Sequence, residues 1–297
     1  MTDVLVAGIA VADFVMQVDD LPAAAEKYRA SEAMVTVGGC AANSAIAVAR
    51  QGGRARLVTR VGDDPVGRII LEDLAREGVD TSLTHRAPGG ISSFSSIAVD
   101  RWGERQIVNF RGRGLTKSTE WLRNVGKPQA VLTDTRWPPL TERVLEIAKG
   151  LGVPGVVDAE PPIEVDTIRA ATHIAFSAPG LGGYAPGLSL PDALDQARQD
   201  FGIWVCVTDG PRGVWFMDGP SIEHIEAFEV ETADTLGAGD VWHGAFALRL
   251  AEGATEVEAV IFANAAAALK CRAFGGVTAC PDRAATEAFL KERMTCS

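Results

Sequence analysis

The segment "ETADTLGAGDVWHGAFALRL", residues 231–250, sets two acids around a run of small residues in a spacing that could do chemistry. Asp234 precedes, and Asp240 follows, the almost side-chain-free stretch Gly237-Ala238-Gly239. Glycine lacks a Cβ, so an anion can approach the backbone N–H groups closely. A helix that begins there adds unpaired N–H groups and a partial positive charge. We therefore predict a phosphate-type anion site at residues 237–239.

Asp240 suggests what that anion site does. A carboxylate repels a bound phosphate, but it is useful if it takes a proton from a hydroxyl that then attacks the phosphorus. Asp240 would then be a general base, and the amides of Gly237, Ala238 and Gly239 would stabilise charge on the transferring phosphoryl group. The alternative is a glycine turn in which Asp240 is a helix N-cap. The chain has no G-x-x-x-x-G-K-[ST] and no G-x-G-x-x-G, so neither a P-loop nor a dinucleotide fingerprint competes.

Apolar runs that alternate with helical patterns predict the elements that position this site. We expect strands over 3–11, 55–62, 130–135, 153–160, 173–177, 203–210 and 228–235, and helices over 40–53, 64–80 and 240–253. The repeated order of strand, helix and strand implies a largely parallel sheet that is covered by helices on both faces. The glycine turn then lies between a strand and a helix N-terminus.

Two segments, 11–37 and 91–111, interrupt this rhythm with hairpin-like strands. Inserted between the strand–helix units, they predict a small antiparallel flap over the carboxyl edge of the main sheet. No long linker, internal repeat or low-complexity tract divides the chain. We therefore expect residues 1–297 to form a single domain with a lid.

Composition and charge limit the function classes. A net charge of −11 argues against a general surface for nucleic acid or for anionic membranes, although a few local cations can still bind an anionic substrate. The cysteines are odd in number and scattered, without a C-x-x-C pair, which indicates reduced thiols and no zinc site: Cys40, Cys206, Cys271, Cys280 and Cys296. With no signal peptide pattern and no membrane-spanning run, we expect a cytoplasmic protein without membrane or nucleic-acid partners.

Residues 234–240 resemble the D-T-x-G-A-G-D signature of the ribokinase-like (PfkB) sugar kinases. Other segments resemble that family in the same order along the chain: "VADF" at 11–14, "VGGCAANSA" at 37–45, "RVGDDPVG" at 60–67, "VTDGPRGV" at 207–214 and "FANAAAALKC" at 262–271. The resemblance covers essentially the whole chain. It implies a three-layer α/β/α sandwich with a mainly parallel central sheet and a small antiparallel β lid.

The resemblance also implies an activity and a set of site residues. The activity is in-line transfer of the γ-phosphoryl group of ATP to a sugar hydroxyl, with Asp240 as base and Mg²⁺ bridging the phosphates. Sugar contacts are implied at Asp13, Gly38, Gly39 and Asn43. Nucleotide contacts are implied at Thr208, Gly210, Gly213, Thr235, Gly237, Gly239 and Asn264. The chain departs from the family where many members carry an N-x-x-E metal pair, because Ser177 and Gly180 stand there, so the direct metal ligands stay unassigned.

Four side chains bear on the identity of the sugar: Lys27, Asn109, Arg111 and Arg136. Taken singly, each cation is more simply a surface or structural residue; together they could form a positive pocket for phosphate or sulfonate oxygens. The stretches "EKYRA", "GERQIVNF", "TDTRW" and "AALKC" resemble one branch of the family, the bacterial 6-deoxy-6-sulfofructose kinases. By that resemblance Lys27, Asn109 and Arg136 grip the sulfonate, whereas Arg111 does not match cleanly.

The resulting hypothesis is a kinase that phosphorylates C1 of a ketose with an anionic group at C6. The alternatives are a neutral-sugar kinase for fructose or ribose, a nucleoside kinase of the same family, a fructose-phosphate kinase, and a non-catalytic sugar or nucleotide sensor on the same fold. An exposed lid leaves free strand edges, and family members often pair through their lids, so we expect a homodimer.

Overall fold

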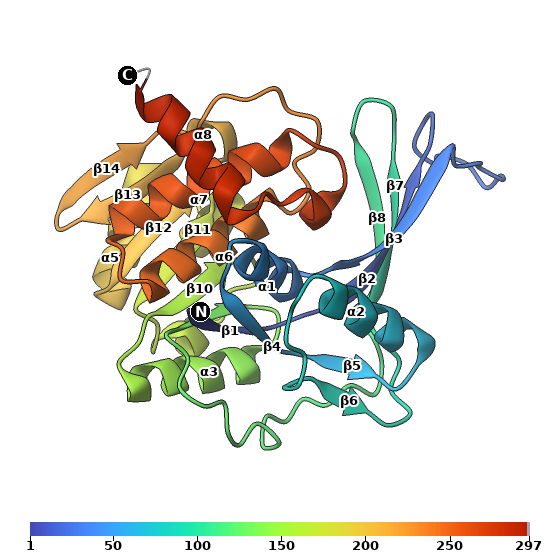
Figure 1. Cartoon of the computed structure of the whole chain (residues 1–297), viewed down its shortest axis with the longest axis horizontal. Coiled ribbons are helices and arrows are strands. Elements are labelled where there is room, and N and C mark those ends of the chain that lie inside the picture. The colour runs from blue at the N-terminus through green and yellow to red at the C-terminus, as the bar shows by residue number, and fades with distance from the viewer. Residues whose placement is uncertain (296–297) are drawn as a thin grey trace.

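The computed structural model describes residues 1–295, and its centre is one eight-stranded sheet (Figure 1). The strands, in their order across the sheet, are β14 (Ser221–Ile225), β13 (Val214–Asp218), β12 (Trp204–Thr208), β11 (His173–Ser177), β10 (Gly155–Ala159), β9 (Ala130–Asp134), β1 (Asp3–Ala7) and β4 (Arg54–Val58). The strands from β12 to β4 are parallel, and β13 and β14 add an antiparallel edge. The parallel strands are buried on both faces, which explains their continuous apolar runs.

Helices cover both faces of this sheet and complete the predicted three-layer sandwich (Figure 1). One face carries α1 (Cys40–Arg50), α6 (Ala238–Ala251) and α7 (Glu256–Cys271), with α8 (Arg283–Thr295) against α7. The other carries α3 (Pro138–Leu151), α4 (Ala178–Tyr184) and α5 (Leu190–Phe201). Side chains alternate along each strand, so Leu132 of β9 packs toward α6 and its neighbour Val131 packs toward α3.

The lid is a separate four-stranded sheet in the order β3 (Glu32–Gly38), β2 (Val11–Gln17), β7 (Phe94–Val99) and β8 (Arg105–Phe110). It stands away from the body at the right of Figure 1, and α2 (Pro65–Arg76) packs against its base. Its two hairpins, β2–β3 and β7–β8, are antiparallel as predicted. The pair that joins them, β2–β7, is parallel, because both strands leave the body in the same direction.

Three predicted strands differ from the structure. The strand expected over 3–11 is interrupted at Gly8, whose φ of 146° separates β1 from β2. The strand expected over 55–62 is two strands, β4 and β5 (Arg60–Gly62), and β5 pairs with β6 (His85–Ala87) in a sheet of its own. The strand expected over 228–235 is absent. The amides of Ala233 and Asp234 instead donate to the carbonyl of Cys271, at the end of α7.

Short 3₁₀ helices at Val165–Ile168, Gly210–Arg212 and Gly276–Ala279 complete the elements. Within the described residues, no helix has the length and apolar character needed to cross a lipid bilayer. Cys40, Cys206, Cys271 and Cys280 are free thiols, and Cys296 lies outside the described residues.

Candidate active site

Two buried acids stand where parallel strands of the main sheet end. Asp134 is the last residue of β9 and Asp158 the penultimate residue of β10, and both are at most 3% exposed. The carboxyl ends of parallel strands meet at one edge, where α/β proteins bind ligands. The Asp134 carboxylate accepts from the amides of Ile9, at 2.8 Å, and Arg136, at 2.9 Å. A Cβ on Gly8 would lie 2.0 Å from Asp134 Oδ2, so this carboxylate requires glycine there.

Asp240 lies in the first turn of α6 and faces the same edge. The N-cap of α6 is Gly237, in the left-handed conformation with φ 76°, and no side chain caps the helix, so the N-cap interpretation of Asp240 is wrong. Asn43 of α1 donates from Nδ2 to Asp240 Oδ2 at 2.7 Å, and the Ser44 hydroxyl donates to the Asp240 carbonyl at 3.0 Å. Helix α1 thus fixes one carboxylate oxygen and leaves the other to act on a ligand.

The surroundings prepare Asp240 to accept a proton. Burial, with the nearby negative charge of Asp158, raises the pKa of Asp240 to about 7, against the lowering effects of Asn43 and His243. Burial also raises the pKa of Asp158 well above its usual range, and Glu160 and Asp134 add to that rise. Burial lowers the pKa of His243, which keeps its ring neutral. A base with a pKa near the working pH is well matched to proton transfer.

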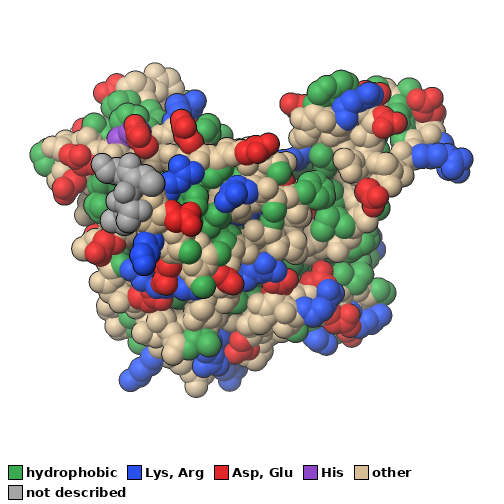
Figure 2. Space-filling view, turned by 45° about the horizontal axis from the view of Figure 1, so that its top comes forward, with side chains coloured by type: hydrophobic (Ala, Val, Ile, Leu, Met, Phe, Trp, Pro, Cys, Tyr) green, Lys and Arg blue, Asp and Glu red, His purple; other side chains and the backbone are tan. Residues whose placement is uncertain are grey.

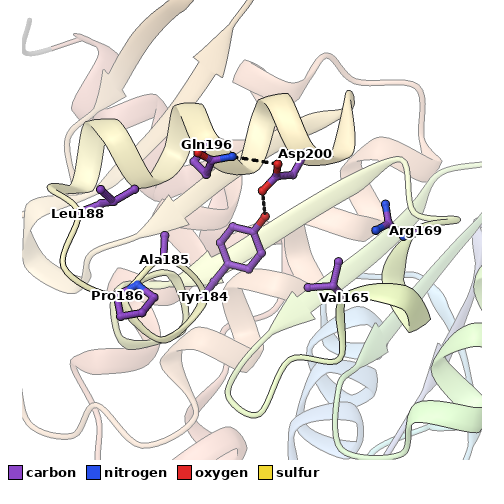
Figure 3. Close-up of a pocket in the computed structure, with 8 residues that line it drawn as sticks. All are labelled: Val165, Arg169, Tyr184, Ala185, Pro186, Leu188, Gln196 and Asp200. Atoms are coloured by element: carbon purple, nitrogen blue, oxygen red, sulfur yellow. Dashed lines mark hydrogen bonds between the residues drawn. The ribbon is translucent and has the colours of Figure 1, made fainter.

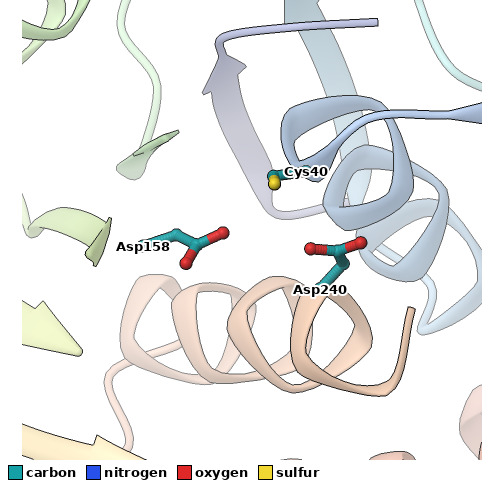
Figure 4. Close-up of side chains that lie close together, drawn as sticks. All are labelled: Cys40, Asp158 and Asp240. Carbon is teal, nitrogen blue, oxygen red and sulfur yellow. The ribbon is translucent and has the colours of Figure 1, made fainter. Parts of the chain in front are cut away.

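Cys40, Asp158 and Asp240 point toward one another (Figure 4), with one ligand atom from each within 4.8 Å of the other two. Burial and the charge of Asp240 raise the pKa of the Cys40 thiol well above its usual range, so the thiol keeps its proton. Asp158 Oδ1 is buried and has no hydrogen-bond partner among the described residues. Carboxylate oxygens are the ligand type that Mg²⁺ prefers, so the free oxygen of Asp158 fits such an ion, whereas the Cys40 thiol does not.

Ser177 and Gly180 serve the fold instead of a metal. Ser177 is the N-cap of α4, and its hydroxyl accepts from the Gly180 amide at 3.0 Å. A Cβ on Gly180 would lie 2.3 Å from the carbonyl oxygen of Ala159. This position therefore has no room for the side chain of any residue larger than glycine. The two positions where the resemblance implied a metal pair therefore hold a helix cap and a close backbone contact in this chain.

A cavity of about 1000 Å³ opens beside the start of α6. Six of the seven predicted nucleotide contacts line it: Thr208, Gly210, Gly213, Thr235, Gly239 and Asn264. The amide of Asn264 is already engaged, since Trp242 Nε1 donates to its Oδ1 at 2.8 Å and its Nδ2 donates to the Glu226 carbonyl. Asn264 thus forms part of the cavity wall, and both its side-chain oxygen and its side-chain nitrogen hydrogen-bond to other protein groups. The seventh residue, Gly237, lies outside the lining.

The predicted anion turn offers fewer amides than expected. The Ala238 amide donates to the Thr235 carbonyl at 3.2 Å, so it is engaged within the turn. The amides of Gly237 and Gly239 have no acceptor among the described residues. A Cβ on Gly239 would meet nothing within 4 Å, because the space above it belongs to the cavity. Of the three predicted donors, Gly237 and Gly239 therefore keep amides available to an anion, whereas the Ala238 amide is engaged within the turn.

The predicted sugar contacts gather at the base of the lid. Strand register places Thr36, Asp13, Ser95 and Asn109 in one row across the lid sheet. Asn109 Nδ2 donates to the Ser95 hydroxyl at 3.1 Å, and Ser95 hydrogen-bonds Asp13. This bond only partly offsets the burial that raises the pKa of Asp13. The row therefore places these four polar side chains on one face of the lid sheet.

Two glycines create room around that row. A Cβ on Gly38 would lie 1.9 Å from Asp13 Oδ2. Gly39 precedes α1 with φ 95°, and a Cβ there would lie 2.7 Å from the carbonyl oxygen of Ile9. The fold therefore requires glycine at both positions.

The predicted cations are placed unequally. Arg136 follows β9 beside the buried acids, and its guanidinium donates to the carbonyl of Pro161. Lys27, in the loop between β2 and β3, and Arg111, just after β8, are exposed. Neither makes a hydrogen bond or an ion pair with any residue that the structure describes. The structure thus ties Asn109 and Arg136 into the site region and leaves Lys27 and Arg111 at its periphery.

Four residues at or beside the candidate site were not among the residues predicted from the sequence: Asp134, Asp158, Arg105 and Lys270. Asp134 and Asp158 could have been found, because both end apolar strand patterns. Arg105 of the lid donates from Nη2 to the Thr235 hydroxyl at 3.1 Å and lies 3.6 Å from Asp234 Oδ1. Lys270 of α7 is fully buried against Asp234. No local pattern marks these two, because their partners are far away in the sequence.

A second hollow, of about 490 Å³, lies on the opposite face of the sheet beside α4 and α5 (Figure 3). There the Tyr184 hydroxyl donates to Asp200 at 2.5 Å, and Gln196 donates to the same carboxylate at 2.9 Å. These polar groups satisfy one another, and the acids at the carboxyl ends of β9 and β10 are not among the lining residues. The chemistry therefore belongs to the edge between Asp240 and the larger cavity.

Comparison with known proteins agrees with this geometry. A model of the pfkB family of carbohydrate kinases matches residues 1–283. Ribokinase from Bacillus subtilis is 30% identical over 297 residues, which cover 98% of this chain and 100% of that protein. A solved structure from Agrobacterium tumefaciens, provisionally called a ribokinase, is 38% identical with a TM-score of 0.93 over 99% of both chains. Arabidopsis thaliana ribokinase, solved with ribose and ATP, shares the fold at 24% identity, with a TM-score of 0.88 over 98% of this chain and 99% of that one.

Proposed function

The chain belongs to the pfkB family of carbohydrate kinases, and from this premise we propose that it transfers the γ-phosphoryl group of ATP to a sugar hydroxyl, with Asp240 as the general base. The observation that carries the proposal is the position of Asp240. Its carboxylate is held by Asn43 at the head of α6, beside the cavity that Gly239 lines. A predicted sugar contact, Asn43, and a predicted nucleotide contact, Gly239, both adjoin this carboxylate, which supports the proposal.

In the proposed reaction Asp240 takes the hydroxyl proton while the sugar oxygen attacks the γ-phosphorus. The bond from that phosphorus to the β–γ bridging oxygen breaks, and ADP leaves with the electron pair. The amides of Gly237 and Gly239 donate to the phosphoryl oxygens as charge develops there. Mg²⁺, when bound through the free carboxylate oxygen of Asp158, would neutralise phosphate charge and leave Asp240 free to act as the base.

For the acceptor we propose C1 of a ketose that is anionic at C6, with 6-deoxy-6-sulfofructose as the first choice. Two features support it: Asn109 lies in the polar row with Asp13, and Arg136 follows β9 at the acidic edge. Lys27 is exposed and unpaired in the lid loop, so it is free to contribute a charge. A neutral sugar is the second candidate, favoured by the ribokinase relatives.

ADP release over a panel of ribose, fructose, adenosine, fructose 6-phosphate and 6-deoxy-6-sulfofructose tests both candidates. For the sulfonate, Arg136→Ala should lower kcat/KM about 10- to 100-fold, the loss of a charged hydrogen bond. Fructose turnover should change less than threefold, and Arg143→Ala, an exposed arginine of α3, is the matched control. An unchanged kcat/KM for the sulfonate in Arg136→Ala contradicts the anionic pocket but not the kinase. No turnover of any sugar contradicts the kinase.

We further propose that two copies pair through their lids. Strand β8 is exposed along its whole length, and Val35 and Val108, which are 47% and 70% exposed, lie in the same cross-strand row. In Figure 2 the lid projects from the body with hydrophobic side chains on its surface. An apolar surface at a free sheet edge is a natural site for pairing with a second copy.

A further inference from the structure

Lys270 is the most deeply buried charged residue that the proposed mechanism does not use. It lies near the end of α7 and is 0% exposed. Its Nζ donates to the Asp234 carbonyl at 2.8 Å and lies 3.2 Å from Asp234 Oδ2. Burying an ammonium group is costly, and the pair with Asp234 offsets that cost only in part. Such a residue is expected to do something for which an apolar side chain would not serve.

Asp234 joins the two turns that border the anion site. Its carboxylate accepts from the Leu236 amide at 2.8 Å, which closes the turn leading into Gly237. It also accepts from the amides of Gly276, at 2.9 Å, and Gly275, at 3.3 Å. These hydrogen bonds, together with Lys270, lower the pKa of Asp234 despite its burial, so it stays ionised. Lys270 is the cation in direct contact with this carboxylate, and Arg105 lies farther away, at 3.6 Å, so loss of Lys270 would leave more negative charge beside the anion turn to repel a phosphate bound there.

We propose that Lys270 is a positioning residue for phosphoryl transfer, whose ammonium group neutralises Asp234 and thereby holds the turn that presents the Gly237 and Gly239 amides. Lys270 touches neither substrate and acts through Asp234. The inference rests on the proposed function, because the amides are argued to receive the transferring phosphoryl group. It goes further in assigning the shape and charge of the anion site to a residue of a different helix.

The test replaces Lys270 with methionine, which keeps its length and removes its charge. Lys270→Met should lower kcat by about 10²- to 10³-fold, as the loss of one anion-hole donor does, and leave the KM for the sugar within threefold. The affinity for AMPPNP, followed by intrinsic tryptophan fluorescence to which Trp242 in the cavity wall contributes, should fall at least fivefold. The matched control is Arg56→Met. Arg56 is also a buried cation, paired with Asp3 at 2.8 Å, but it lies on β4 outside the site.

Rescue by small cations separates a charge effect from a packing effect. Ammonium or methylammonium ions should restore kcat of Lys270→Met at least tenfold, and they should not change wild type or Arg56→Met. A kcat within threefold of wild type, or a loss that neither cation restores, overturns the proposal. If Lys270→Met does not fold, Lys270→Arg decides. That variant keeps the charge and should retain more than a tenth of wild-type kcat, so a larger loss in folded Lys270→Arg overturns the proposal.

The failure of this inference is distinguishable from the failure of the proposed function. If wild type binds AMPPNP but turns over no sugar, the kinase proposal is rejected. The role of Lys270 is then tested by AMPPNP affinity alone, which should still be at least fivefold weaker in Lys270→Met. Wild-type turnover with an unimpaired Lys270→Met variant keeps the kinase and rejects the positioning role. A wild type that does not bind AMPPNP rejects both.

Discussion

At the scale of single residues, the site depends on one carboxylate whose environment is set by its neighbours. Asn43 fixes one oxygen of Asp240, and burial with the charge of Asp158 makes the group basic. Asp158 has an unpartnered oxygen, and His243 is buried and neutral beside it. The chemistry assigned to Asp240 therefore rests on contacts from α1, β10 and α6 together.

Asp240→Asn should lower kcat by about 10²- to 10⁴-fold, the range for losing a general base, because an amide cannot accept the hydroxyl proton. AMPPNP affinity should stay within threefold, since the amides of Gly237 and Gly239 remain. Steady-state kinetics and AMPPNP titration measure the two effects, and circular dichroism checks the fold. Near wild-type turnover in this variant would remove Asp240 from its role.

The pH dependence of kcat/KM reports the same group. Asp240 acts only when deprotonated, so kcat/KM should fall about tenfold per pH unit below its pKa of about 7. Asp158→Asn removes a negative charge that raises this pKa, so the acidic limb should move to lower pH. The measurement is a pH–rate profile of the two proteins with a saturating concentration of ATP. An acidic limb that stays in place or moves to higher pH would contradict the assigned coupling.

At the scale of elements, the turn before α6 separates two uses of glycine. Gly237 has φ 76°, whereas Gly239 has an ordinary helical backbone and open space where a Cβ would point. Gly239→Val should therefore fold normally and lose turnover, because the side chain enters the cavity. Gly237→Val should lose both folding stability and turnover. Thermal melts beside kcat separate the two, and equal destabilisation by both variants would make residue 239 a structural position.

The lid is linked to that turn through Arg105. Its guanidinium reaches Thr235 from β8, so removing it loosens the contact between the lid and the anion turn. Arg105→Gln should raise the KM for the sugar about 2- to 10-fold, the worth of one hydrogen bond, with little change in kcat. Arg101→Gln is the control, because Arg101 lies in the same hairpin but contacts exposed groups away from the anion turn, at Asp19, Asp20 and Trp102. If both variants raise the KM for the sugar equally, the effect comes from any change in the lid and not from the contact between Arg105 and Thr235.

Most elements were predictable because their signals are local. Apolar runs marked β9, β10, β11 and β12, and period-2 patterns marked the lid hairpins. The segment 228–235 also looked like a strand, yet its amides bond to the end of α7, and no local pattern encodes that partner. The residues of the site also fall into those with a local sequence signal and those without one. Asp240 and its glycines lie in one motif, whereas Lys270 and Arg105 join Asp234 across 36 and 129 positions of sequence.

At the scale of the whole molecule, the exposed lid predicts self-association. Wild type should be a dimer by light scattering at micromolar concentration, because an apolar lid surface at a free strand edge favours pairing. Val108→Glu, which places a charge on that surface, should be monomeric with an unchanged thermal melt of its body. Monomeric wild type would contradict pairing through the lids.

The buried acids at the carboxyl edge of the sheet also bear on how a turnover ends. In the proposed reaction, Asp240 holds the proton of the acceptor hydroxyl at the moment of transfer. Once that proton escapes, Asp240 regains its negative charge beside a newly made phosphate ester, and like charges at short range repel strongly where water is scarce. We therefore expect the carboxylate that readies the sugar for attack also to favour release of the product.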